Sequence, residues 1–220
     1  MEPKKPGMKW LILGNKIPRT YCCTAGFGQA NTGSGVDPYE TESYDAALMA
    51  AKLENCNIVT YSSVLPPEAV EVPLDTVVQR FHHGAVTETI MASVSATQGR
   101  IIVAAVGRIQ VYDPHGTHLG GFAAEFAETY PTGTLAEAEA KARQAIAQSL
   151  HDEYARRYTG RGYRYESQPL TLASGVIEHA YGTALAALVW VDYLCPVLGE
   201  IESTPEHPEP ALAHWPPICA

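Results

Sequence analysis

Runs of apolar and β-branched residues predict that most of the chain forms strands. The clearest run covers residues 100–113, which are almost continuously apolar and are expected to form a strand buried on both faces. The same reasoning predicts further extended segments at residues 10–14, 15–28, 57–61, 84–97, 121–130, 161–172 and 174–193.

Two segments carry helical spacing instead. The first covers residues 39–57. The second follows Thr134, which is predicted to form a T-x-x-E capping box with Glu137, and its apolar residues recur every four positions. These positions are Ala138, Ala142, Ile146, Leu150 and Tyr154. Because two helices are too few for a doubly wound parallel sheet, the expected fold class is an α+β layered sandwich.

Two stretches rich in glycine or proline are expected to be irregular. Residues 26–38 predict a loop bordering a pocket; their glycine spacing is neither that of a P-loop nor G-x-G-x-x-G, so nucleotide binding is not expected. Residues 196–220 hold six of the sixteen prolines and predict a C-terminal tail. Residues 1–195 are therefore expected to form a single domain.

Composition excludes several classes of function. The length of 220 residues suits one domain with a sizeable core. A formal net charge of −9 argues against a nucleic-acid partner, which would need a basic face. No apolar run reaches the ~20 residues of a membrane span. The five cysteines lack C-x-x-C spacing, so reduced thiols in a cytoplasmic protein are expected.

Metal and hydrolase chemistry have little support in the sequence. The adjacent His82 and His83, and the turn residues His115 and His118, do not have the spacing of metal ligands, so no metal is expected. The chain also lacks a G-x-S-x-G elbow, which leaves a hydrolase triad without support.

The adjacent serines Ser62 and Ser63 follow a β-branched run and precede two prolines. A serine hydroxyl can attack the carbonyl carbon of the preceding residue and convert the amide into an ester. β-Elimination then leaves dehydroalanine, and hydrolysis releases ammonia and leaves a pyruvoyl group at the new chain start. This chemistry needs a small residue before the serine and a well-held turn, which a strand followed by proline favours. The dipeptide by itself indicates no more than a polar turn.

The order of motifs around these serines resembles the pyruvoyl-dependent arginine decarboxylase family, in its bacterial branch. The resemblance runs from about Leu13 to Tyr193 and rests on a D-x-A-L core, an N-x-N-hydrophobic step and an S-S-hydrophobic-hydrophobic-P cleavage site. Here these motifs are Asp45–Leu48, Asn55–Ile58 and Ser62–Pro66. The later stretches "HHGAVTETIMA", "GGFAAEFAETYPT" and "GVIEHAYGTALAALVW" are also similar to segments of the family.

The resemblance implies a four-layer α/β/β/α sandwich with mostly antiparallel sheets. It also implies self-cleavage into a β chain of residues 1–62 and an α chain of residues 63–220. The covalent pyruvoyl cofactor would derive from Ser63, with neither a metal nor pyridoxal phosphate. The cleaved protomers would form a homotrimer with active sites at the protomer interfaces. The implied reaction is decarboxylation of L-arginine to agmatine, a step of polyamine biosynthesis, with the cofactor as electron sink when CO2 leaves.

The resemblance also assigns roles to residues. Ser63 would be the self-processing nucleophile, and Ser62 would become the new C-terminus and border the substrate. Asp45 matches the aspartate that holds the substrate guanidinium, a task suited to a bidentate carboxylate. Glu125 matches the proton donor, and its apolar neighbours are expected to keep it protonated near neutral pH.

Other matches carry less information about the reaction. Asn55 and Asn57 match positions that support cleavage by orienting the scissile carbonyl, and Glu178 and His179 match a family pair without an assigned role. The stretch "GFGQAN" stands where the family often has an acidic G-E-S or G-E-T. Lysine, ornithine or another amino acid therefore stay open as the small-molecule substrate, as does a catalytically silent binding or scaffold relative.

Overall fold

The structure, a computed structural model, describes residues 9–202, and the chain divides into two units. The larger unit is Pro18–Tyr193. In the smaller unit, β1 (Lys9–Leu13) pairs antiparallel with β12 (Val197–Glu202). The prediction of an irregular tail from residue 196 is therefore wrong for residues 197–202, because pairing with β1 satisfies their backbone groups as a strand. The rest of the predicted tail lies outside the described residues.

One sheet of the larger unit, here called the α1 sheet, has the strand order β3-β6-β11-β2-β5. β6 pairs parallel with β3 and antiparallel with β11, and β5 pairs parallel with β2. The bounds are β2 (Ile17–Ala30), β3 (Asn57–Thr60), β5 (Val70–Glu71), β6 (Val86–Thr97) and β11 (Tyr181–Leu194). Short 3₁₀ turns at Leu74–Thr76 and Val78–Arg80 connect β5 to β6.

The second sheet, here called the α2 sheet, has the order β10-β7-β8-β4, and β9 also pairs with β7. Every one of these pairs is antiparallel. The bounds are β4 (Val64–Leu65), β7 (Ile101–Tyr112), β8 (His118–Tyr130), β9 (Arg164–Ser167) and β10 (Thr171–Val176). Together the two sheets confirm the predicted α+β class with mostly antiparallel pairing.

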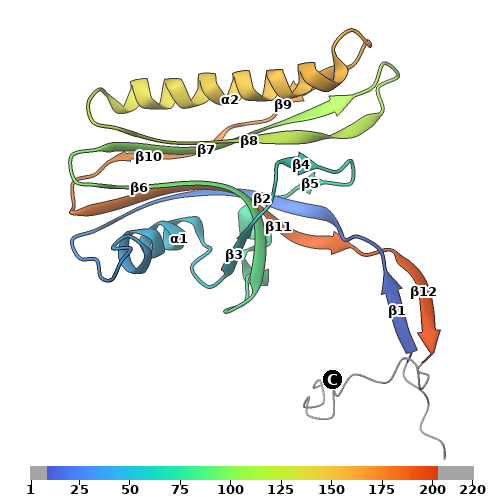
Figure 1. Cartoon of the computed structure of the whole chain (residues 1–220), viewed down its shortest axis with the longest axis horizontal. Helices are drawn as coiled ribbons and strands as arrows, with labels where there is room; N and C mark the ends of the chain where they lie inside the picture. The colour runs from blue at the N-terminus through green and yellow to red at the C-terminus, as the bar shows by residue number, and fades with distance from the viewer. Residues whose placement is uncertain (1–8, 203–220) are drawn as a thin grey trace, which may run out of the picture. The chain divides into compact units, whose positions relative to one another are not determined.

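Three buried clusters place these elements in layers (Figure 1). The two sheets face each other across one cluster, which includes Ile102 and Val106 of β7 and Leu188 of β11. Helix α2 packs on the outer face of the α2 sheet, and α1 packs on the outer face of the α1 sheet. β7 is nearly continuously apolar because its alternate residues face the other sheet and α2, so both faces are buried.

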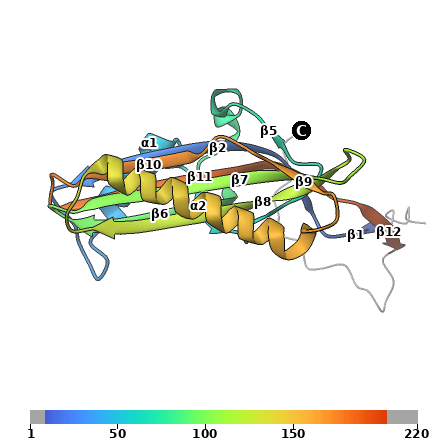
Figure 2. The ribbon, with the colours of Figure 1, turned by 90° about the horizontal axis from the view of Figure 1, so that it is seen from above.

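Helix α2 (Leu135–Tyr158) begins and packs as its sequence pattern predicts. The side chain of Thr134 accepts from the backbone of Glu137, and the Glu137 carboxylate accepts from the backbone of Thr134, which completes the capping box. Viewed from above, the helix runs obliquely across β7 and β8 (Figure 2). Its buried positions lie on the predicted stripe: Ala138, Ala142, Ile146 and Leu150.

Helix α1 (Asp45–Ala51) is shorter than the predicted helical segment, and it follows a π-helical turn at Glu40–Tyr44. It ends where Lys52 adopts a left-handed conformation with φ 65°. The prediction of a loop over residues 26–38 is wrong for its first part, because β2 continues to Ala30. A Cβ at Gly26 would lie 2.0 Å from the Ala47 carbonyl oxygen, and one at Gly28 would lie 2.3 Å from the Ala47 nitrogen. These glycines let α1 pack closely against a strand.

Candidate active site

The Ser62–Ser63 bond lies where the chain passes from one sheet to the other. Before it, β3 belongs to the α1 sheet, and the Tyr61 N–H donates to the Thr89 carbonyl at 2.6 Å. After it, β4 belongs to the α2 sheet, and the Ala123 N–H donates to the Ser63 carbonyl at 2.9 Å. The bond is therefore anchored on both sides by strands of different sheets.

The side chain of Tyr61 strengthens the first of these anchors. It packs against the core between the sheets, as does Tyr193. Burial and a hydrogen bond with Glu88 raise the pKa of the Tyr193 hydroxyl, and the nearby Tyr61 adds to the effect. Tyr61, next to Ser62, thus belongs to a partly buried polar group within the larger unit.

The Ser62 carbonyl, which is the predicted point of attack, is held in a tight turn. Its oxygen accepts a hydrogen bond from the Val64 N–H at 3.1 Å, across Ser63. A donor in this position polarises the carbonyl and stabilises negative charge that develops on its oxygen. Gly120 has φ +94°, and a Cβ there would lie 2.3 Å from the Leu65 carbonyl oxygen. Glycine therefore allows the chain at the start of β8 to approach β4.

Ser63 and Glu125 are in direct contact. The Ser63 Oγ donates a hydrogen bond to Glu125 Oε1 at 2.7 Å, which brings together the predicted nucleophile and the predicted proton donor. Ser63 is half-buried and Glu125 is exposed. The neighbours Ala123 and Ala124 are buried on opposite faces of β8. The predicted apolar surroundings therefore border Glu125 without enclosing its carboxylate in this chain.

A cavity of about 390 Å³ opens beside this pair. It is walled on one side by the cleavage segment and β8, and on the other by α2. Its lining residues are Ser62, Ser63, Val64, Ala123, Ala124, Glu125, Ser149, Glu153 and Arg157. The wall carries hydroxyl, carboxylate and guanidinium groups close to Ser63, which suits a small polar ligand rather than an apolar one.

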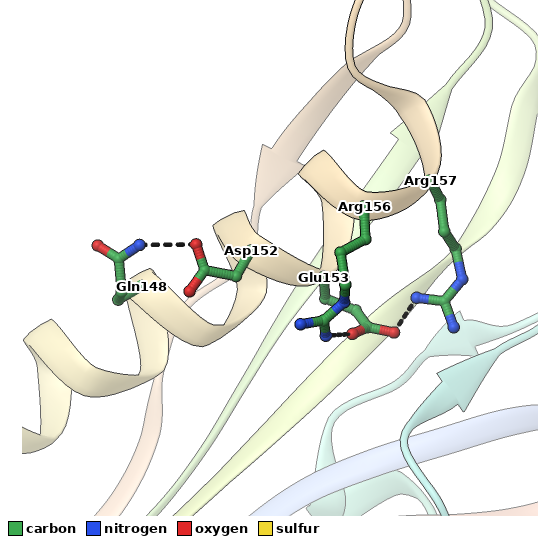
Figure 3. A network of polar contacts seen from close by, with 5 residues as sticks. All are labelled: Gln148, Asp152, Glu153, Arg156 and Arg157. Carbon is green, nitrogen blue, oxygen red and sulfur yellow. Dashed lines mark hydrogen bonds and ion pairs between the residues drawn. The ribbon is translucent and has the colours of Figure 1, made fainter.

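The motifs recognised in the sequence do not include the polar residues of α2 in this wall. Ser149, Glu153 and Arg157 follow one another at four-residue spacing along the helix. Glu153 forms ion pairs with both Arg156 and Arg157, as Figure 3 shows. The spacing that predicts the buried stripe could also have indicated this second, polar stripe, but not that it would lie opposite Ser63.

Asp45 is not among the residues that line the cavity. It is the first residue of α1 and is exposed. Since α1 covers the face of the α1 sheet that points away from the α2 sheet, the structure does not bring Asp45 together with Ser63 and Glu125 in one chain.

The remaining matched residues form hydrogen bonds with segments distant in the sequence. Asn57 Nδ2 donates to the Gly84 carbonyl at 3.0 Å, and Asn55 Oδ1 lies 3.1 Å from His83 Nδ1. These contacts join the start of β3 to the loop before β6 and do not involve the Ser62 carbonyl. The backbone N–H groups of residues 178 and 179 both donate to the Gln29 side chain.

Two further features of residues 9–202 bear on the predictions. No group of three or more His, Cys, Asp or Glu side chains among them is placed to hold a metal ion. In the same range, none of the helices combines the length and the apolar character needed to cross a membrane.

Comparisons with known proteins identify the family of this chain. The family model described as pyruvoyl-dependent arginine decarboxylase matches residues 20–195. Pyruvoyl-dependent arginine decarboxylase AaxB of Chlamydia pneumoniae is 41% identical over 149 residues, covering 65% of this chain and 76% of that protein. The protein of the same name from Chlamydia abortus is 42% identical over 146 residues, covering 64% and 75%. This chain therefore belongs to the pyruvoyl-dependent arginine decarboxylase family.

Proposed function

We propose that this protein cuts itself between Ser62 and Ser63 and then decarboxylates L-arginine to agmatine and CO2. The observation that carries the proposal is the hydrogen bond from Ser63 Oγ to Glu125 Oε1 beside a polar cavity. The relatives from Chlamydia are named as arginine decarboxylases, which supports arginine as the substrate. All four cysteines of residues 9–202 are free thiols, which supports a reducing compartment. We therefore place the protein in the cytoplasm.

Self-cleavage uses groups that are already in contact. Glu125 accepts the Ser63 hydroxyl proton as Oγ attacks the Ser62 carbonyl carbon, and the Val64 N–H stabilises the charge on the carbonyl oxygen. Glu125 returns this proton to the Ser63 nitrogen as the C–N bond breaks, which leaves an ester of Ser62 and a free amine on Ser63. Loss of the Ser63 α-proton then expels the Ser62 carboxylate by β-elimination and leaves dehydroalanine. Addition of water to its imine tautomer releases ammonia and leaves a pyruvoyl group at residue 63.

The two products of cleavage would stay together. Residues 1–62 include β2, which lies between β11 and β5 in the α1 sheet, and α1, which packs in the cluster beneath that sheet. Both elements are held by strands from residues 63–220. Separating the chains would expose this apolar surface to water, so non-covalent association is strongly favoured.

The residues around Ser63 fit the cofactor. The group needs a serine after a small residue, and the cavity beside it has room for a small polar ligand. Once formed, the pyruvoyl group supplies an electron sink for the carbanion left when CO2 departs. Glu125 is positioned beside residue 63 to hold a proton and deliver it to the substrate α-carbon. Ser62, as a new C-terminus, borders the same cavity.

We also propose that the mature protein is a homotrimer and that Asp45 binds the substrate guanidinium across a protomer interface. Asp45 does not line the cavity of its own chain, so this role requires a neighbouring protomer to supply it. Its exposed position at the start of α1 leaves the carboxylate accessible to such a neighbour.

Intact mass under denaturing, reducing conditions tests the cleavage, and CO2 release from a panel of amino acids tests the reaction. Two fragments that meet at Ser62 and Ser63, with the larger one blocked and lighter by the loss of ammonia, would support the proposal. CO2 release from lysine or ornithine but not from arginine would show that one of these amino acids, and not arginine, is the substrate. A cleaved protein without activity on any amino acid would favour a binding relative.

A further inference from the structure

Helix α2 presents a cation to the cavity beside Ser63. Among the described residues that line this cavity, Arg157 is the only one with a positively charged side chain, while Glu125 and Glu153 carry carboxylates. Arg157 lies one turn along the helix from Glu153, so both side chains project from the same face. The proposed steps of self-cleavage and proton delivery involve neither residue.

The Arg157 guanidinium is held by two contacts. It forms an ion pair with Glu153 Oε1, and its Cζ lies 4.7 Å from the centroid of the Phe122 ring on β8. Long exposed side chains are ordinarily free to change rotamer, whereas an ion pair and an aromatic face together restrict the guanidinium to one region. A cation fixed in this way is preorganised to receive an anion.

The surrounding charges leave the cation incompletely neutralised. Glu153 is shared between Arg156 and Arg157, so this group of three side chains has one more guanidinium than carboxylate (Figure 3). Across the cavity, the Glu125 carboxyl group lies beside Ser63 and offers an oxygen that can accept a hydrogen bond. The wall at Arg157 therefore attracts the carboxylate end of a zwitterion, and the wall at Ser63 can receive its amine.

We propose that Arg157 binds the α-carboxylate of the amino-acid substrate, which directs the α-amine toward residue 63 and Glu125. The inference rests on the proposed function, because it names the part of the substrate that this wall recognises. Glu153 is a positioning residue that holds Arg157. The contact between Arg157 and the carboxylate forms in the ground state, so removing this contact is expected to raise KM more than it lowers kcat.

The test compares Arg157→Gln with Arg156→Gln. Both changes remove a guanidinium that pairs with Glu153, but Arg156 does not line the cavity. We expect Arg157→Gln to raise the KM for arginine roughly 10- to 100-fold, the range for a lost charge-assisted hydrogen bond. Arg156→Gln is expected to change it less than about twofold.

Agmatine separates carboxylate binding from a structural effect, because it lacks only the carboxylate of arginine. Its dissociation constant, measured by calorimetry on the cleaved protein, is expected to stay within about twofold in Arg157→Gln, since no contact with the missing group is lost. Arg157→Lys keeps the charge and is expected to recover part of the arginine affinity without altering agmatine binding. Complete cleavage at residues 62 and 63 shows that each variant has folded.

Three results would overturn the inference. An unchanged KM for arginine in Arg157→Gln would do so. So would an equal weakening of arginine binding and agmatine binding in this variant. If Arg157→Gln fails to fold, a loss of agmatine affinity in Arg157→Lys decides against it. Absence of CO2 release from arginine by the wild-type protein would instead overturn the proposed function and, with it, this assignment.

Discussion

Ser63 donates its hydroxyl hydrogen to Glu125 over 2.7 Å while the chain is still uncut. The carboxylate that the family resemblance assigns to proton delivery during turnover therefore also contacts the nucleophile of self-cleavage. Because one group serves at both stages, a change at Glu125 is expected to affect maturation as well as catalysis.

Glu125→Gln should slow both steps. The family resemblance assigns Glu125 to turnover, which by itself predicts normal cleavage and poor turnover. Glutamine cannot take the Ser63 proton, however, so the contact also predicts slower cleavage. We expect CO2 release per cleaved protomer to fall roughly 100- to 10,000-fold. Time-resolved intact mass measures cleavage. Glu128→Gln, an exposed carboxylate on the same strand outside the cavity, is the control. Wild-type cleavage kinetics in Glu125→Gln would contradict the maturation role.

Ser63→Ala should give a folded, uncut and inactive chain, because alanine has no hydroxyl to attack the Ser62 carbonyl. The thermal unfolding midpoint, intact mass and CO2 release measure these three properties. Ser62→Ala keeps a small residue before the nucleophile and is expected to cleave. Decarboxylation by uncut Ser63→Ala would rule out a cofactor derived from this serine.

Asp45→Asn should raise the KM for arginine with a smaller effect on kcat, because an amide cannot form the charged bidentate contact with a guanidinium. The exposed Glu42, in the turn before α1, gives the control Glu42→Gln. If the KM for arginine is unchanged, Asp45 has no part in binding the basic group.

Arg108 should be important for stability because it is buried between the sheets with its polar groups satisfied. It is 2% exposed, pairs with Glu71 of β5, and donates to the Tyr21 hydroxyl at 3.3 Å and the Pro169 carbonyl at 2.9 Å. We expect Arg108→Met to lower the free energy of unfolding by about 2 to 3 kcal/mol, because three partners lose their donor.

Urea titration in the uncut Ser63→Ala background, at fixed protein concentration, measures this loss on a single chain. Arg143→Met on the exposed side of α2 is the matched control and should change the free energy of unfolding by less than about 0.5 kcal/mol. Equal effects of the two substitutions would show that the buried contacts of Arg108 contribute little.

The cysteines should differ in their reaction with iodoacetamide. Burial raises the pKa of the Cys22 thiol to about 12 and that of Cys23 to about 11, so very little thiolate forms at pH 8. Among the four cysteines of residues 9–202, Cys195 is the one that is exposed and should be alkylated first. Peptide mass spectrometry after timed labelling of the native protein checks the order, and rapid labelling of Cys22 would contradict it.

Local sequence patterns predicted helix α2 and strand β7. The Thr134–Glu137 capping box and the stripe of α2 follow from spacing, and β7 is recognisable because both of its faces are buried. The glycines of β2 were misleading, since glycine indicates a loop by composition but here accommodates a helix against a strand.

The candidate site was only partly predictable. Ser62, Ser63 and Glu125 came from the family resemblance, and the structure brings them together. The role of Arg157 could not be found in this way, because its position opposite Ser63 depends on how α2 packs across β7 and β8. The two-residue strand β4 is too short to show any periodicity, yet it fixes the segment that carries Ser63.

The passage of the chain between sheets at residues 61–64 has a consequence for the lifetime of the molecule. Before cleavage, refolding is an event within one chain and does not depend on concentration. After cleavage, an unfolded molecule must find its partner fragment again, so recovery becomes second order in protein. The mature protein is thus expected to be protected mainly by slow unfolding, and heating it should cause losses that the uncut precursor can reverse.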